Sequence, residues 1–154
     1  MSTVPPVSTV RDASLGELDP ATLYRILALR MDVFVVEQEC VYPELDGRDL
    51  EASARQLWIE RDGAVLATLR LLRDSDGSAR IGRVATATHA RGEGLAADLM
   101  QRALEICGTS DIALNAQRYL LDWYARFGFE RDGADYLEDG IAHVPMRRRP
   151  DSRT

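Results

Sequence analysis

The sequence contains no lysine, so all 19 of its basic residues are arginine. This absence excludes a lysine Schiff base, a lysine nucleophile and a phosphate-binding loop built on the G-K-[ST] lysine. The sequence also lacks a run of about 18 apolar residues that could span a membrane. Residues 1–10 lack the basic start and apolar block of a secretory signal. We therefore expect a cytoplasmic protein with no membrane contact.

The sequence also has few cysteines, and its basic residues are outnumbered by acidic ones. Cys40 and Cys107 are too few for a disulfide framework and lack the spacing of metal ligands. We expect both thiols to be reduced and buried, and we expect no metal site. The 25 acidic residues outnumber the 19 arginines, which gives a net charge of −6. This charge argues against nucleic acid as a partner, because nucleic acid attracts basic surfaces.

The length of 154 residues fits one domain. We expect a single domain over residues 1–154, with flexible ends at about residues 1–7 and 148–154. Asp19-Pro20 predicts a helix start, because Asp can cap a helix and Pro suits its first position. The side chains expected to face inward from this helix are apolar and follow three- and four-residue steps: Leu23, Ile26, Leu27, Met31 and Phe34.

The rest of the chain alternates between strand and helix patterns. Residues 57–59, 65–72 and 81–86 predict three antiparallel strands. The pattern then predicts a helix to Cys107, a strand at 112–114, a short helix over 118–126 and a hairpin of residues 129–136 and 141–146. The order β-α-β-β-β-α-β-α-β-β predicts an α+β fold with a mixed sheet.

The motif that carries chemistry is Arg91-Gly92-Glu93-Gly94, between the strand at 81–86 and a helix. A glycine-bearing turn at a helix N-terminus can bind a pyrophosphate, because unpaired backbone N–H groups and the helix dipole favour an anion. A dinucleotide fingerprint would need a third glycine at Ala97, or its looser form, and a parallel βαβ unit. A turn with a purely structural role is a further alternative.

Three blocks of the sequence together resemble the GNAT N-acetyltransferases. Residues 91–96 are similar to the family's R-x-x-G-x-G/A acetyl-CoA loop, and residues 123–129 to its Y-x-x-x-G-F segment. Residues 29–38 resemble the ElaA-like branch of the family. The resemblance implies the GNAT fold, a central mostly antiparallel sheet with a splayed strand pair flanked by helices.

The resemblance also implies that acetyl-CoA binds as a cosubstrate. Pantetheine would run along the strand at 81–86 and the pyrophosphate would lie on the following loop. Gln117 stands where many relatives carry an asparagine that binds pantetheine. The cofactor-binding residues implied are Val84, Thr86, Arg91, Gly92, Glu93, Gly94, Leu95, Ala96, Gln117 and Tyr124.

Tyr124 matches the family's general acid, which protonates the leaving thiolate. A phenol with a pKa near 10 can donate to the thiolate of a thiol with a pKa of about 8.5. The alternative is that Tyr124 is only a buried aromatic residue on a short amphipathic helix.

A general base would also help, because a free primary amine is mostly protonated at neutral pH. Glu37 is the first candidate, since it follows the first helix, where the family's acceptor groove opens. The alternatives that stay open are Glu39, Glu44, Asp46 and His143. The residues expected to bind the acceptor are Phe34, Glu37, Tyr42, Asp46 and His143.

The sequence therefore predicts an N-acetyltransferase that acts on a small-molecule or peptide amine by direct attack in a ternary complex. An acidic pocket would favour a cationic acceptor. A non-catalytic CoA-binding or regulatory module of the same fold is one alternative, and an enzyme similar to acyl-homoserine-lactone synthases is another. Related enzymes are often dimers, which leaves a homodimer open.

Overall fold

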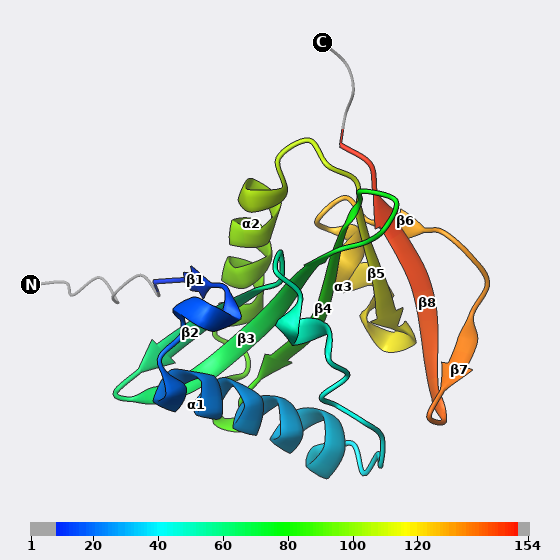
Figure 1. The fold of residues 1–154 in the computed structure, drawn as a ribbon. Coiled ribbons are helices and arrows are strands. Elements are labelled where there is room, and N and C mark those ends of the chain that lie inside the picture. Colours follow the sequence, from blue (N-terminus) through cyan, green and yellow to red (C-terminus); the bar gives the residue numbers. More distant parts are fainter. Residues whose placement is uncertain (1–8, 151–154) are drawn as a thin grey trace, which may run out of the picture.

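The computed structural model describes residues 9–150, and Figure 1 shows their arrangement. The expected flexible residues 1–7 and 151–154 lie outside this range. Arg148, also expected in a flexible end, instead belongs to a strand, where it pairs with Ile112, and its Nε donates a 2.9 Å hydrogen bond to the carbonyl oxygen of Phe127. Within residues 9–150, no helix is long and apolar enough to cross a membrane.

The centre of the fold is an eight-stranded mixed sheet, which confirms the predicted α+β fold class. Its order is β1-β2-β3-β4-β5-β8-β6, with β7 also paired to β8, and only β4 and β5 are parallel. The strands are β1 (Arg11–Ala13), β2 (Arg55–Arg61), β3 (Ala64–Arg73), β4 (Ala79–Thr86), β5 (Ile112–Gln117), β6 (Glu130–Arg131), β7 (Tyr136–Glu138) and β8 (Ile141–Arg148). The segment predicted as one strand over 129–136 is thus two short strands, β6 and β7.

The main helices are α1 (Pro20–Met31), α2 (Leu95–Cys107) and α3 (Leu121–Ala125). The predicted start of α1 is confirmed: Asp19 caps it by accepting a 2.9 Å hydrogen bond from the backbone N–H of Thr22. A π-helical turn, η2 (Asp32–Glu37), extends α1. The first turn of the short helix expected over 118–126 is the 3-10 helix η5 (Arg118–Leu120).

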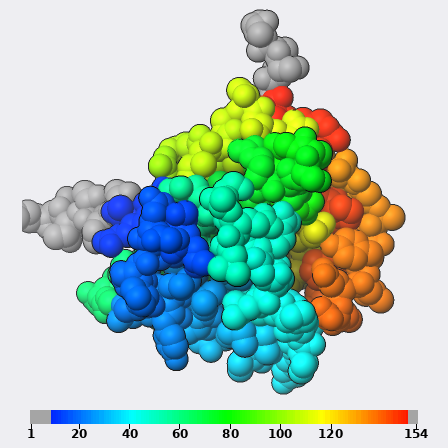
Figure 2. Space-filling view, in the orientation of Figure 1, coloured from blue at the N-terminus to red at the C-terminus, as the bar shows by residue number. Residues whose placement is uncertain are grey.

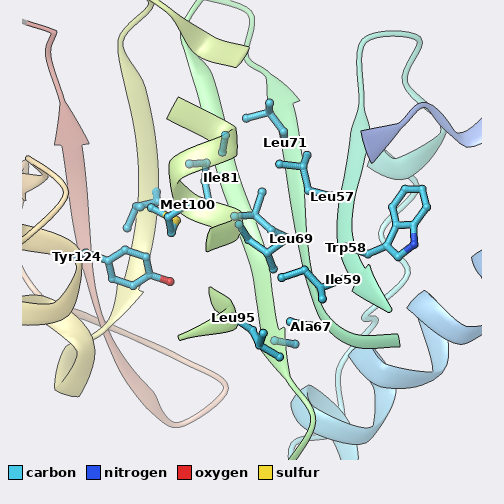
Figure 3. Close-up of a cluster of buried hydrophobic side chains, with 14 of the residues drawn as sticks. Leu57, Trp58, Ile59, Ala67, Leu69, Leu71, Ile81, Leu95, Met100 and Tyr124 are labelled. Carbon is cyan, nitrogen blue, oxygen red and sulfur yellow. The ribbon is translucent and has the colours of Figure 1, made fainter. Parts of the chain in front are cut away.

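Helices α1 and α2 cover opposite faces of the sheet. Successive strand side chains point to opposite faces. In β3, Leu69 belongs with Met100 of α2 to the buried apolar cluster drawn in Figure 3. The next side chain, Arg70, is bonded to Asp49, which also binds Arg30 of α1. Each helix therefore closes one face of the same strands.

The buried face of α1 differs from the apolar face expected. Its buried side chains are Thr22, Ile26, Leu29 and Arg30, whereas Met31 is 39% exposed. At 100° per residue, this face is rotated by roughly a quarter turn from the one expected. The reason is Arg30, which is fully buried and ion-paired with Glu44 at 2.6 Å and with Asp49 at 2.7 Å.

Strands β4 and β5 separate after two paired positions. Ala79 faces Ile112 and Arg80 faces Ala113, and beyond them Figure 1 shows the two arrows diverging. β4 is also bulged on its other side, because Leu69 of β3 lies opposite two residues, Arg83 and Val84. Arg83 has a φ of 53°, in the left-handed region. Residues 81–86 of β4 thus have no strand partner on the β5 side.

Arg30→Met is expected to lower the free energy of unfolding by about 3–5 kcal/mol, because two buried carboxylates, Glu44 and Asp49, each lose one of their arginine partners. Arg25→Met is the matched control on the same helix, since Arg25 is exposed and its replacement should change stability by less than about 0.5 kcal/mol. Urea unfolding followed by circular dichroism measures both. Equal stability of the two variants would contradict the structural role of Arg30.

Candidate active site

A cavity of about 770 Å³ opens where β4 and β5 diverge. It is bounded by the segment after α1, by β4, β5 and α3, and by the β7–β8 hairpin. In Figure 2, a furrow marks this face where the cyan segment around residue 45 meets the orange strands near the C-terminus. The cavity brings together most of the predicted site residues: Phe34, Glu37, Tyr42, Asp46, Val84, Thr86, Arg91, Ala96, Gln117, Tyr124 and His143.

The remaining predicted site residues are Gly92, Glu93 and Gly94 in the loop before α2, and Leu95, the first residue of α2. Gly92 has a φ of 85°, and Gly94, the N-cap of α2, has a φ of 79°, a region that glycine adopts without strain. Glu93 is turned to Arg61 of β2, 3.0 Å away, and Leu95 is buried in the core. The side chains of Glu93 and Leu95 thus point elsewhere, and the loop can offer an anion its backbone N–H groups.

The free edge of β4 lies beside this loop. Val84 and Thr86 are half-buried and line the cavity. Backbone N–H and C=O groups on a strand edge without a partner can bind an extended chain that contains amides. The pantetheine arm of CoA is such a chain, so the edge and the loop together fit its two polar parts, the amides and the pyrophosphate.

Arg91 is held by Glu37. Its guanidinium donates two hydrogen bonds to the carboxylate, at 2.6 and 2.5 Å, although both side chains are 41% exposed. These hydrogen bonds lower the pKa of Glu37 below its usual range. A carboxylate held in this way is a weaker proton acceptor than a free one.

Gln117 is held in the same manner by Gln38. Gln117 lies on β5 and Gln38 directly follows η2, and their two side-chain amides exchange hydrogen bonds of 3.3 and 3.4 Å. Two residues adjacent in sequence, Glu37 and Gln38, therefore contact two side chains predicted to bind the cofactor.

Tyr124 lies on α3 and is 7% exposed. Its ring makes edge contacts with Trp123, at 4.9 Å between centroids, and with Phe129, at 6.3 Å. Figure 3 shows its hydroxyl pointing toward the β4 side. Burial raises the pKa of Tyr124, so the phenol keeps its proton throughout the neutral range.

On the other side of the cavity, Asp46 belongs to a largely buried charge network, and Tyr42 is bonded to it. We use this term for three arginines and three carboxylates: Arg30, Arg70, Arg83, Glu44, Asp46 and Asp49. Tyr42 donates a 2.5 Å hydrogen bond to Glu44, and Arg83 lies over its ring, 5.7 Å from the centroid. Asp46 binds Arg70 at 2.8 and 3.0 Å. The polar atoms of both residues thus fix the wall of the cavity.

His143 is on β8, opposite the charge network. Its Nδ1 lies 2.8 Å from the carbonyl oxygen of Ile141, and its ring stacks on Tyr136 with 5.6 Å between centroids. Phe34 is half-buried at the end of the cavity nearer α1. Among residues 9–150, no three His, Cys, Asp or Glu side chains are grouped so that they could hold a metal ion.

The cavity wall is not acidic, in contrast to the acidic pocket that the sequence analysis considered. The wall carries five arginines, Arg48, Arg70, Arg80, Arg83 and Arg91, and four carboxylates, Glu37, Asp46, Glu138 and Asp139. The negative charge of the whole chain is therefore not concentrated at this site.

The sequence reasoning missed Arg30, Arg70 and Gln38. A signal for Arg30 was present, because it lies four residues after Ile26 and three before Val33, on a helix face that is otherwise apolar. Arg70 likewise interrupts the apolar run of β3, where Leu69 and Leu71 flank it. A charge at such a position indicates a buried ion pair.

Comparisons with known proteins agree on one family. A family model described as "Acetyltransferase (GNAT) domain" matches residues 31–150. A UPF0039 protein of Mycobacterium tuberculosis is 50% identical over 136 residues, which cover 86% of this chain and 87% of the relative.

Solved structures are also similar. A crystal structure titled as an acyl-CoA N-acyltransferase from Pseudomonas aeruginosa has a TM-score of 0.88 and 41% identity, covering 92% of this chain and 99% of that one. Escherichia coli ElaA has a TM-score of 0.86 and 35% identity, with the same coverage. These likenesses confirm the predicted fold and the resemblance to the ElaA-like branch.

Asp46 is expected to make stability depend on acid pH. Burial raises its pKa, but hydrogen bonds from Arg70 and from the Arg48 backbone N–H outweigh burial and lower the pKa to about 2. Because the unfolded value is about 3.9, Asp46 stabilises the fold above pH 4, and this stabilisation is lost as the pH falls toward 2.

The measurement is urea unfolding of the wild type and of Asp46→Asn at pH 6 and pH 3. The difference in unfolding free energy between the two proteins should narrow at pH 3. Asp98→Asn on the exposed side of α2 is the control, and its difference from the wild type should change little. A gap for Asp46→Asn that is equal at both pH values would refute the assignment.

Proposed function

The chain belongs to the GNAT acetyltransferase family, as a relative of ElaA, and we propose that it acts as a single-domain N-acetyltransferase that acetylates a primary amine. The donor we propose is acetyl-CoA. The acceptor is a small molecule or a peptide, and it attacks directly in a ternary complex.

One observation carries this proposal. A single cavity is lined by the free edge of β4, by Arg91 at the loop before α2 and by the buried hydroxyl-bearing Tyr124. An extended thioester lying on β4, with its pyrophosphate at the N-terminus of α2, would bring its sulfur toward α3. A simple phosphate-binding turn would need neither the strand edge nor Tyr124.

Acetyl-CoA supplies an activated acyl group, the thioester, to this cavity. In the reaction, a nitrogen–carbon bond forms between the acceptor and the acetyl group, and the carbon–sulfur bond breaks. The bulge at Arg83 and Val84 alters the direction of the β4 backbone N–H groups. We propose that one of them donates a hydrogen bond to the acetyl oxygen, where negative charge develops.

We propose that Tyr124 donates its proton to the leaving sulfur. Burial raises the pKa of the phenol, but a thiol beside it in the same apolar site would also have a raised pKa, since burial disfavours the thiolate. Proton transfer from the phenol then avoids a buried thiolate. The indole of Trp123 and the ring of Phe129 hold the phenol in place.

The acceptor amine must lose one proton, and Glu37 is the base we propose. Its carboxylate lies on the cavity wall between the cofactor loop and the segment that leads to the charge network. The ion pair with Arg91 weakens it as a base, so this role requires Arg91 to be engaged elsewhere. His143, on the opposite wall, and Phe34 and Tyr42 would bound the acceptor.

Tyr124→Phe is expected to lower kcat for acetyl transfer by about 10²-fold with little change in KM, because the phenyl ring keeps the packing and only the proton donor is lost. The release of free CoA thiol, measured over a panel of primary amines, gives the rate. Tyr24→Phe is the control, since Tyr24 is 75% exposed on α1. An unchanged rate for Tyr124→Phe would show that its acid role is wrong.

Calorimetry with acetyl-CoA separates the two functional alternatives. Binding without thiol release over the whole amine panel would favour a non-catalytic CoA-binding module. Failure to bind acetyl-CoA at all would overturn the proposed function.

A further inference from the structure

The π-helical turn η2 ends beside the proposed cofactor site. Its last residue, Glu37, binds Arg91 with two hydrogen bonds of 2.6 and 2.5 Å. The next residue, Gln38, exchanges amide hydrogen bonds with Gln117 at 3.3 and 3.4 Å. These contacts join residues 54 and 79 positions apart. One short segment therefore holds the side chains of two separate cofactor-site elements.

The Glu37 carboxylate and the Gln38 amide resemble parts of CoA in chemistry, and both lie at the proposed cofactor site. A carboxylate that accepts two hydrogen bonds from a guanidinium takes the position that a phosphate oxygen pair would take. An amide that both donates to and accepts from Gln117 offers the same groups as a pantetheine amide. The N–H groups of Arg91 that bind Glu37, and the amide groups of Gln117 that bind Gln38, are occupied as long as these bonds last.

We propose that Glu37 and Gln38 are internal competitors of CoA: when CoA binds, Arg91 exchanges its bonds to Glu37 for bonds to the pyrophosphate, and Gln117 exchanges its bonds to Gln38 for bonds to pantetheine. This inference rests on the proposed function. It implies that CoA binds before the acceptor. Binding of CoA releases the carboxylate of Glu37 from Arg91 and makes it available to the acceptor amine. The acceptor then meets a competent site only after the donor has bound.

The rest of the segment is anchored, so the exchange needs only side-chain movement. Upstream, Arg30 fixes the end of α1 through Glu44 and Asp49. Downstream, Cys40 is buried, and its Sγ lies 3.6 Å from the carbonyl oxygen of Asp139 in the β7–β8 turn. Glu37 itself is exposed enough to rotate into solvent.

The first test compares Glu37→Gln with Glu39→Gln by calorimetry. Glu39 is an exposed carboxylate two residues away that makes no ion pair within residues 9–150, so its replacement removes the same charge without freeing Arg91. Glu37→Gln should bind CoA about three- to fivefold more tightly than the wild type, as expected for the loss of a competing exposed ion pair.

The second test uses pantetheine, which lacks the pyrophosphate, measured by competition against CoA. Glu37→Gln should leave pantetheine affinity unchanged, whereas Gln38→Ala should raise the affinity for pantetheine and for CoA alike, by about twofold. This difference between the two variants would assign Glu37 to the pyrophosphate part of CoA and Gln38 to the pantetheine part. Thermal unfolding checks that both variants fold.

Unchanged or weaker CoA binding by Glu37→Gln would overturn the inference, as would an equal gain for Glu39→Gln, because that gain would be a general effect of charge. These outcomes differ from the failure of the proposed function, in which the wild type itself would not bind CoA.

Discussion

The buried charge network is the interaction on which the rest of the structure depends. Arg30 is fully buried, and its partners Glu44 and Asp49 come from the irregular segment between α1 and β2. That segment has little regular structure of its own, so its place over β3 and β4 is set by its bonds to Arg30, Arg70 and Arg83. Guanidinium groups suit this role better than ammonium groups, because one arginine can bind two carboxylates in fixed directions.

The second constraint is the separation of β4 from β5. Two paired positions join the strands, and the next residues of β4 have no partner on that side. The cost of leaving backbone groups unpaired at the centre of a sheet is offset when a ligand with amides takes the place of the missing strand. The bulge at Arg83 connects the two constraints, because the side chain of this residue reaches Glu44 while its backbone turns the free edge of β4.

Local sequence signals could predict the strands of the meander, the helix start at Asp19 and the glycine loop, because turn residues, caps and periodicity are properties of neighbouring residues. The role proposed for Tyr124 came from the family resemblance and not from a local pattern. The face of α1 was predicted wrongly, because hydrophobic periodicity treats Arg30 as exposed when its partners lie 14 and 19 residues away. The bonds of Glu37 and Gln38 to Arg91 and Gln117 depend on a fold that brings distant segments together, and no local pattern carries that information.

The same network bears on the choice of acceptor. The three arginines and three carboxylates of the network balance one another in charge, and the polar atoms of Asp46 and Tyr42 are bonded within it. The negative charge of the chain therefore gives this wall no general attraction for cations. Outside the network, the cavity wall also carries Glu138 and Asp139 on the β7–β8 hairpin, where Tyr136 and His143 stack. For the acetyl transfer that we propose, the acceptor would therefore be selected by local contacts at the cavity, including those at the β7–β8 hairpin, rather than by the net charge of the protein.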